Sequence, residues 1–272
     1  MLSLAGTLDQ VQQHVPRGFP VTVASTPRRG MEPTLALVES LSRSGFEAVP
    51  HLAARLVADE GQLVEILHRL DDAGIRDVFV IAGDGRPVGD YADSLGLLSA
   101  MRRLTQAGLA PVIGRIGIAG YPEGHPAIGA ADLTQAPVAK QPMTNYIVSQ
   151  MCFDAETISA WASGVRRTDV RLPIHVGIPG MVDHRRLLRI VRRIGVGPSA
   201  RFLRKHRFGL VRLARPGGYR PDRLLGGLAP DLSDPDRGVV GLHVYTLGDV
   251  AATERWRRAT IDRLTGVEAG HA

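Results

Sequence analysis

Short apolar runs alternate with longer amphipathic stretches along most of the chain, and this alternation restricts the fold more than any other feature. Seven runs are almost continuously hydrophobic, as strands buried on both faces must be. They cover residues 21–24, 47–52, 77–82, 116–119, 146–149, 174–178 and 239–244. Because helical patterns separate them, the runs predict a parallel sheet whose strands are connected by helices.

Three of the helical stretches carry clear apolar stripes. The stripes consist of Leu35, Val38 and Leu41, of Leu63, Ile66, Leu67 and Leu70, and of Leu187, Leu188, Val191 and Ile194. The second stretch stops at Gly74 and the third at Gly195, since glycine readily adopts the conformation that ends a helix.

The chain has 272 residues, 44% of them hydrophobic, which is enough for one large core, and no linker divides it. We therefore expect a single domain over residues 1–272 with the fold of a TIM-type (βα)8 barrel. An open doubly wound sheet is the alternative. No GxGxxG motif follows a strand, which counts against the nucleotide-binding form of that sheet.

A closed barrel of this type has eight strands, but only seven can be read from the sequence. The missing strand should precede Val21. Residues 1–20 contain no clear strand and at most a short helix from Leu8 to His14. We therefore expect an irregular segment or a short helix to replace the first strand over residues 1–20.

The sequence shows none of the marks of a membrane or secreted protein. No run approaches the roughly 18–20 apolar residues of a transmembrane helix, and the N-terminus lacks a secretory signal. Cys152, the single cysteine, excludes a disulfide framework and is expected to pack rather than react. We therefore expect a cytoplasmic protein with no membrane partner, and its oligomeric state is left open, with a homo-oligomer among the alternatives.

Positive charge is concentrated in one segment of a chain whose net charge is +6. Nine arginines and lysines lie between His184 and Arg207, and they form either a site for polyanions or the solvated face of two helices. Aromatic residues make up only 5% of the chain, which argues against nucleic acid as a partner bound by base stacking. No HxH or HExxH pattern predicts a metal site.

Polar residues follow several of the predicted strands, where the active site of a TIM barrel lies. They are His51, Gly83 and Asp84, Tyr121, Glu123 and His125 in one tight loop, and Gln150. Asp84 either accepts hydrogen bonds from a heterocycle or caps a turn. Gln150 either forms hydrogen bonds with the donors and acceptors on the edge of a heterocycle or is a core amide whose hydrogen bonds are satisfied within the protein. Glu123 and His51 either belong to the site or have ordinary structural roles. In the second case Glu123 is a solvated acid of the loop and His51 is a structural histidine.

These strand-end residues belong to segments that, taken in order, resemble the methylenetetrahydrofolate reductase family in a short, actinobacterial-type form. The segments are AVPHL at 48–52, VIAGD at 80–84, DYADSL at 90–95, IAGYPEGHP at 118–126, SQMCFD at 149–154, GIPG at 177–180 and HVYTL at 243–247. The loop with YPEGHP and the strand that ends in Gln before Phe-Asp are the most specific. The resemblance runs from about residue 21 to the C-terminus.

The resemblance implies a barrel that reduces 5,10-methylenetetrahydrofolate with NADH or NADPH, using FAD. It places Asp84 near both flavin and folate and Gln150 on the pterin. It also implies that seven further residues line the flavin: His51, Gly83, Tyr91, Ala92, Tyr121, His125 and Asp132. The partner would be a tetrahydrofolate derivative.

Several positions depart from the family pattern. Ala82 stands where other members have an arginine, and Ala24 stands where they have a threonine. The basic pair that holds the flavin phosphates aligns with Val138 and Ala139, which leaves only Lys140 nearby. The reaction is therefore expected to run either through a flavin or directly between nicotinamide and folate.

The largest departure is that the family's catalytic glutamate, which lies on the first barrel strand, is not found. In an alternative alignment with the family, residues 27–32 follow the first strand. Ala24 then occupies the position of the catalytic glutamate. We therefore expect little or no reductase activity from this chain, and activity from a chain with a start upstream of Met1. If the chain is active as it stands, Glu123 is the first candidate for the proton donor, because it shares a loop with His125.

Three other functions are left open. One is a folate- or flavin-binding barrel that serves as a sensor or subunit, which the missing glutamate favours. The second is the reverse reaction, oxidation of methyl-folate during demethylation. The third is a different TIM-barrel oxidoreductase that uses a deazaflavin or pterin.

Overall fold

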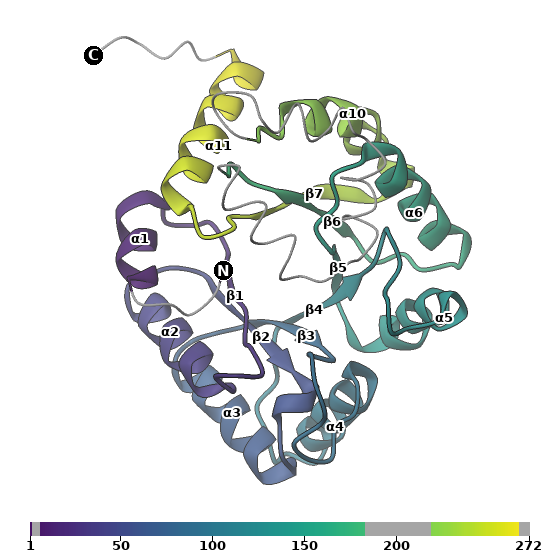
Figure 1. Ribbon diagram of the computed structural model, residues 1–272. Coiled ribbons are helices and arrows are strands. Elements are labelled where there is room, and N and C mark those ends of the chain that lie inside the picture. Colours follow the sequence, from purple (N-terminus) through teal and green to yellow (C-terminus); the bar gives the residue numbers. More distant parts are fainter. Residues whose placement is uncertain (2–5, 183–218, 267–272) are drawn as a thin grey trace.

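A computed structural model describes residues 1, 6–182 and 219–266 of the chain (Figure 1). The third apolar stripe, which ends at Gly195, and the basic segment from His184 to Arg207 lie outside the described residues. Among the described residues, no helix combines the length and the apolar character needed to cross a membrane.

Seven parallel strands form one sheet in which each strand pairs with the next one along the chain. They are β1 (Val21–Val23), β2 (Ala48–Ala53), β3 (Asp77–Ile81), β4 (Arg115–Gly120), β5 (Tyr146–Ser149), β6 (Ile174–Pro179) and β7 (Val239–Tyr245). All seven predicted strands are confirmed. The sheet curls, and the prediction of a TIM-type barrel with one strand missing is confirmed as well (Figure 1).

Helices cover the outside of the curled sheet (Figure 1). The α-helices of the described residues are α1 (Thr7–His14), α2 (Glu32–Arg43), α3 (Glu60–Asp72), α4 (Ser94–Gln106), α5 (Ala130–Lys140), α6 (Ala155–Arg167), α10 (Asp222–Ser233) and α11 (Val250–Thr265). Short 3-10 helices are η1 (Ala54–Leu56), η2 (Gln141–Met143) and η3 (Pro235–Arg237). The helix α1 overlaps the short helix expected from Leu8 to His14.

Local sequence explains where several helices begin and end. The side chains of Asp59, Asp93, Asp154 and Asp249 accept a hydrogen bond from the backbone of the first turn of α3, α4, α6 and α11. After α3 the chain turns at Gly74, whose φ of 71° favours glycine.

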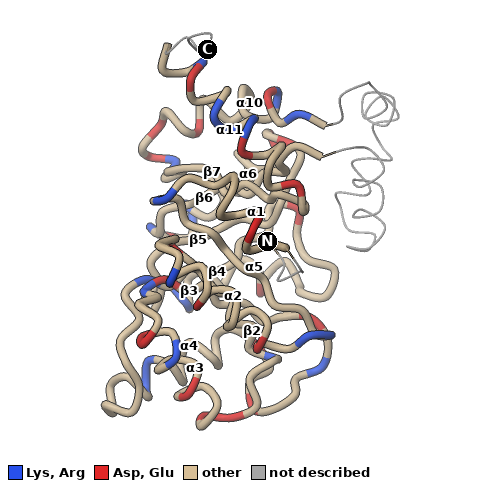
Figure 2. The backbone as a smooth tube through the Cα atoms, turned by 90° about the vertical axis from the view of Figure 1, so that its left-hand side faces the viewer, with Lys and Arg blue, Asp and Glu red and all other residues tan. Residues whose placement is uncertain are grey.

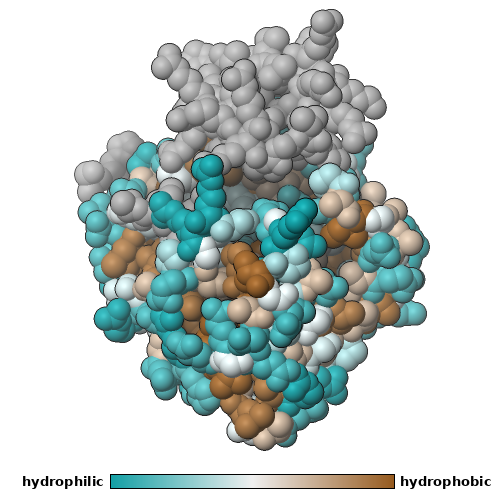
Figure 3. Space-filling model, turned by 60° about the horizontal axis from the view of Figure 1, so that its bottom comes forward, coloured by the Kyte–Doolittle hydropathy of each residue, from teal (hydrophilic) through white to brown (hydrophobic). Residues whose placement is uncertain are grey.

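The apolar stripes predicted for α2 and α3 are buried against the sheet. Leu41, Leu63, Leu67 and Leu70 are fully buried, and they pack in one core with strand residues such as Leu52. Leucine side chains of this kind each contribute about 1.5–3 kcal/mol when they leave water. On the outside, hydrophilic residues surround separate apolar patches (Figure 3).

The barrel is open between β7 and β1, where the described strands form no ladder. Met1 lies along the free edge of β1, donating from its amino group to the Thr22 carbonyl (2.5 Å) and accepting at its own carbonyl from the Ala24 N–H (2.7 Å). Across the opening, the Thr22 hydroxyl is 3.4 Å from Nε2 of His243 in β7.

Helices close the outer layer over this opening. The helices α1 and α11 lie side by side (Figures 1 and 2), and Arg258 of α11 donates to the His14 carbonyl at the end of α1 (3.1 Å). Only Val239 is buried in β7, whereas all four residues of β5 are buried. The open edge thus leaves β7 less covered than a strand with two neighbours.

Candidate functional site

Polar side chains gather at the carboxyl end of the barrel, which we call the mouth. Asp84 follows β3, Tyr121 follows β4, and Tyr245 ends β7. Burial raises the pKa of Tyr121, and the negative charge of Asp84 raises it further. Burial and then Tyr121 likewise raise the pKa of Tyr245. The three residues are therefore neighbours, although they come from distant parts of the chain.

The end of β5 is fixed by hydrogen bonds to three other strands. Tyr245 donates from its hydroxyl to the Ser149 carbonyl (3.2 Å), and the Gly177 N–H donates to the Ser149 hydroxyl (2.8 Å). The N–H of Gln150 donates to the Gly120 carbonyl (2.7 Å). The backbone of Gln150 is thus held in place, while the residue as a whole stays exposed at the mouth, as a ligand contact requires.

Gly83 is required by the geometry of the loop after β3. Its φ is 82°, and a Cβ at this position would lie 2.9 Å from Cβ of Ala53 on β2. The loop therefore passes close to β2 and leaves Asp84 exposed just beyond it.

The tight loop after β4 brings two rings together. Tyr121 and His125 pack edge to face, with ring centroids 5.1 Å apart. The Ala127 N–H donates to Nδ1 of His125 (3.2 Å), so a neutral imidazole carries its proton on Nε2. His125 thus offers a donor beside the aromatic face of Tyr121.

Glu123 of the same loop is half-buried and lies near Cys152. Burial, with a smaller contribution from the negative charge of Glu123, raises the pKa of Cys152 to about 12. The thiol is fully buried and stays protonated, so the predicted packing role of Cys152 is confirmed.

His51 lies in the middle of β2 rather than after its end, which corrects its assignment to a strand end. Its ring packs on Phe79 with centroids 4.7 Å apart. Burial lowers its pKa well below the ordinary value, as do the positive charges of the Met1 amino group and His243. His51 is therefore a neutral group inside the barrel.

Three other predicted flavin residues have different surroundings. Tyr91 is buried, and its hydroxyl has no hydrogen-bond partner among the described residues. Burial raises its pKa, and the charge of Glu60 in α3 raises it further, which places the hydroxyl among the helices. Ala92 is exposed, and Asp132 is exposed in the first turn of α5. The structure thus brings together Gly83, Asp84, Tyr121 and His125, whereas it places the Tyr91 hydroxyl beside Glu60 of α3.

The sequence model of the methylenetetrahydrofolate reductase family matches residues 2–200, which is more than half of the chain. The chain belongs to the methylenetetrahydrofolate reductase family. It is accordingly a methylenetetrahydrofolate reductase-like oxidoreductase, and the family to which it belongs is generally flavin-dependent.

Solved structures resemble this member of the family only remotely. A provisionally assigned phosphonomutase from Burkholderia cenocepacia J2315 is 12% identical, with 90% of this chain and 84% of that chain covered and a TM-score of 0.46. A provisionally assigned lyase/mutase from the same organism is 15% identical, with 94% and 81% covered and a TM-score of 0.47. Similarities at this level establish no shared function.

Among the described residues, the mouth of this reductase-like barrel offers an aromatic face and a hydrogen-bond donor, which suit a flat heteroaromatic group. Tyr121 supplies an aromatic face and His125 a donor. Lys140, the cation left by the family pattern, is partly buried and its pKa is lowered by burial, while Asp93 raises it. The negative charge of Asp93, which caps α4, thus favours the protonated form of that lysine.

A second polar cluster, which no sequence pattern predicted, lies at the opposite end of the barrel, which we call the base. Tyr146 donates to Oδ1 of Asp77 (2.8 Å), and Arg115 lies 3.7 Å from Oδ2 of the same carboxylate. His175 packs edge to face on Tyr146, with centroids 5.6 Å apart. These residues begin neighbouring strands, so only the pairing of β3 to β6 brings them together.

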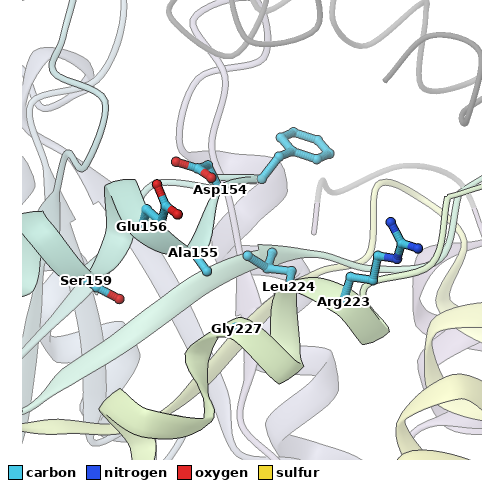
Figure 4. A pocket seen from close by; sticks show the side chains of 8 residues that line it. Asp154, Ala155, Glu156, Ser159, Arg223, Leu224 and Gly227 are labelled. Atoms are coloured by element: carbon cyan, nitrogen blue, oxygen red, sulfur yellow. The ribbon is translucent and has the colours of Figure 1, made fainter. Parts of the chain in front are cut away.

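A hollow of about 630 Å³ lies between the starts of α6 and α10 (Figure 4). It is lined by Phe153, Asp154, Ala155, Glu156, Ser159, Arg223, Leu224 and Gly227. None of the predicted site residues lines it. Within the described ranges, no group of three or more His, Cys, Asp or Glu side chains could hold a metal ion.

Proposed function

We propose that this protein transfers a hydride between NADH or NADPH and 5,10-methylenetetrahydrofolate, forming 5-methyltetrahydrofolate. The observation that supports the proposal is that Asp84, Tyr121 and Gln150 all follow strand ends at the mouth of a barrel from this family. The substrate class is a tetrahydrofolate derivative, held with its pterin against Gln150. The side-chain amide of Gln150 can form hydrogen bonds with both a donor and an acceptor on the edge of a heterocycle.

In this reaction, residues of the chain would supply a proton and stabilise the positive charge that develops on the folate. N10 of the folate must be protonated so that its bond to the methylene carbon breaks and the five-membered ring opens to an iminium on N5, which requires a general acid. The carboxylate of Asp84 would stabilise the cation that develops. Its exposed position at the mouth leaves it available to a ligand.

Should the chain be active as it stands, Glu123 is the first candidate for the acid. It lies on the loop that carries Tyr121 and His125 and is half-buried near Cys152. A FAD, when bound, would carry the hydride from the nicotinamide to the folate. Gly83, Asp84, Tyr121 and His125 are the residues placed to hold its ring, and direct transfer from nicotinamide is the alternative.

A turnover assay tests the proposal. Formation of methyl-folate from NADH or NADPH would be measured with and without added FAD, together with the absorbance spectrum of the purified protein. We expect methyl-folate to form above the uncatalysed rate, and the Asp84→Asn variant to lose this activity. The absence of both methyl-folate formation and folate binding would contradict the proposed function.

The second candidate is a folate- or flavin-binding barrel without reductase activity. The observation that favours it is that residues 1–24 contain no glutamate to match the one that the family carries on its first strand. Tight binding of 5-methyltetrahydrofolate without turnover in either direction would support this candidate. Oxidation of methyl-folate with NAD or NADP would instead point to the reverse reaction.

A further inference from the structure

Arg55 binds both ends of the loop that carries Asp84. It lies in η1, directly after β2, whereas the loop of residues 82–92 follows the neighbouring strand β3. Its Nη1 donates to the Gly85 carbonyl (3.1 Å), and its Nε donates to the Ala92 carbonyl (2.8 Å). One guanidinium thus holds two points of the loop that are seven residues apart in sequence.

The backbone of Arg55 is joined to the same loop. The Arg55 N–H donates to the Ala82 carbonyl (2.9 Å), and the Val88 N–H donates to the Arg55 carbonyl (3.0 Å). Next to it, the Asp90 N–H donates to the Ala58 carbonyl (2.9 Å). Four of these five hydrogen bonds involve Arg55, so the shape of the loop depends mainly on this residue.

Apart from Tyr91, which is buried, the loop has little else to fix its shape. Residues 84–90 are all exposed, so no apolar core holds them. A loop with few buried contacts opens easily, and its order depends on the hydrogen bonds at its ends. The arginine fork is suited to this role because its donors have a fixed spacing, which the single ammonium group of lysine cannot reproduce.

We propose that Arg55 is a positioning residue that holds the loop of residues 82–92 in the shape that ligand binding at the mouth requires. This inference rests on the proposed function, because the ligand is taken to be the folate. The hydrogen bonds of Arg55 described above all join it to backbone groups of the loop. Arg55 acts through Asp84, which must be held in place if its carboxylate is to meet the developing charge.

The experiment compares Arg55→Gln and Arg55→Lys with the parent chain, using hydrogen exchange and ligand binding. Exchange is measured at the amides of Val88 and Asp90, which are protected by the hydrogen bonds described above. Binding is measured with 5-methyltetrahydrofolate as the probe. Arg86→Gln is the matched control, because Arg86 is an exposed arginine of the same loop with no hydrogen bond or ion pair in the described parts of the chain.

We expect both Arg55 variants to exchange these two amides about 10-fold faster and to bind the probe about 10-fold more weakly, since each loses at least one hydrogen bond of the fork. Arg86→Gln should change neither value. If Arg55→Lys also shows faster exchange and weaker binding, the role of Arg55 depends on the geometry of the guanidinium and not on its charge alone. Unfolding temperature and circular dichroism show whether the variants are folded.

Unchanged amide exchange in Arg55→Gln would overturn the inference, as would faster exchange with unchanged affinity for the probe. Full recovery in Arg55→Lys would also overturn it, because charge alone would then be sufficient. A parent chain that binds no folate would contradict the proposed function, and with it the ligand named here. The exchange measurement would still show independently whether Arg55 orders the loop.

Discussion

The two ends of the barrel use polar residues in opposite ways. At the base, Asp77, Tyr146 and Arg115 satisfy one another, and His175 packs against them. At the mouth, Asp84 and Gln150 are exposed, although the backbone beside them is firmly held. The barrel thus holds the backbone at the mouth and leaves the side chains of Asp84 and Gln150 exposed.

This difference separates residues that stabilise the fold from residues that are available to a ligand. A buried polar group without a partner costs about 1–3 kcal/mol, so the base must pair its charges internally. Exposed groups at the mouth carry no such cost and can exchange water for a ligand. Substitutions at the base should therefore affect unfolding, and substitutions at the mouth should affect binding and turnover.

The largest expected effect concerns the proton donor at the mouth. Fusing an apolar strand that bears a glutamate in front of Met1 would extend the chain along β1 into the opening beside β7. We expect turnover to rise by roughly 100- to 10,000-fold, the usual contribution of a general acid. Methyl-folate formation by the fused chain and by the same fusion with glutamine in place of the glutamate measures this directly.

The opposite outcome is equally informative. If the chain turns over on the order of 1–1000 times per second without the added strand, its acid is already present. In that case Glu123→Gln should lower turnover by roughly 100- to 10,000-fold while the unfolding temperature stays the same. A fully active Glu123→Gln variant would exclude this residue as the donor.

Asp84→Asn keeps the shape of the side chain but removes its charge. We expect turnover to fall by about 10- to 1000-fold, as for other electrostatic contacts to a transition state. The free energy of unfolding should change by less than about 0.5 kcal/mol, because the residue is exposed. If the fall in turnover were matched by an equivalent loss in the free energy of unfolding, Asp84 would be a structural residue of the loop.

Gln150→Ala removes the amide proposed to contact the pterin. We expect the affinity for folate to fall by roughly 1–3 kcal/mol in binding free energy, with the circular dichroism unchanged. Titration with 5-methyltetrahydrofolate measures the effect. Unchanged affinity in a folded variant would rule out the assignment of Gln150 to the substrate.

Tyr146→Phe tests the base. The substitution leaves Asp77 without its phenol donor, and we expect a loss of about 1–2 kcal/mol in the free energy of unfolding. Turnover and folate affinity of the folded variant should equal those of the parent. Denaturant unfolding checks the first value, and a change in affinity without a change in stability would break the distinction between base and mouth.

The smallest effect is a dependence of stability on pH. Burial lowers the pKa of His243 to about 3, with smaller contributions from the positive charge of the Met1 amino group and from His175. Between pH 6.5 and 3 the unfolded chain therefore binds a proton that the folded chain does not. The stability from this residue is present above pH 6.5 and is lost as the pH falls.

We expect this residue to account for roughly 1 kcal/mol between pH 7.5 and pH 6. Denaturant unfolding of His243→Gln at the two pH values should show a smaller difference than the parent. His68→Gln, at an exposed position of α3, should keep the parent's dependence. An unaltered pH dependence in His243→Gln would mean that the imidazole is not buried in solution.

The sequence by itself determined the framework of the protein. Continuous apolar runs predicted all seven strands, because strands covered on both faces have no solvent-exposed side to make polar. Helical periodicity predicted the buried stripes of α2 and α3. The strand-end rule also found Asp84, Tyr121 and Gln150, since parallel strands bring their carboxyl ends to one edge.

Only the tertiary structure decided which distant residues meet. The fork of Arg55 reaches Gly85 and Ala92, which are 30 and 37 positions away, and no local pattern marks such a contact. The base cluster likewise depends on the register of neighbouring strands. His51 was placed too near the end of its strand because apolar periodicity gives the existence of a strand but not its last residue. Sequence thus encodes each element through local periodicity, whereas the meeting of side chains depends on the pairing of strands across the fold.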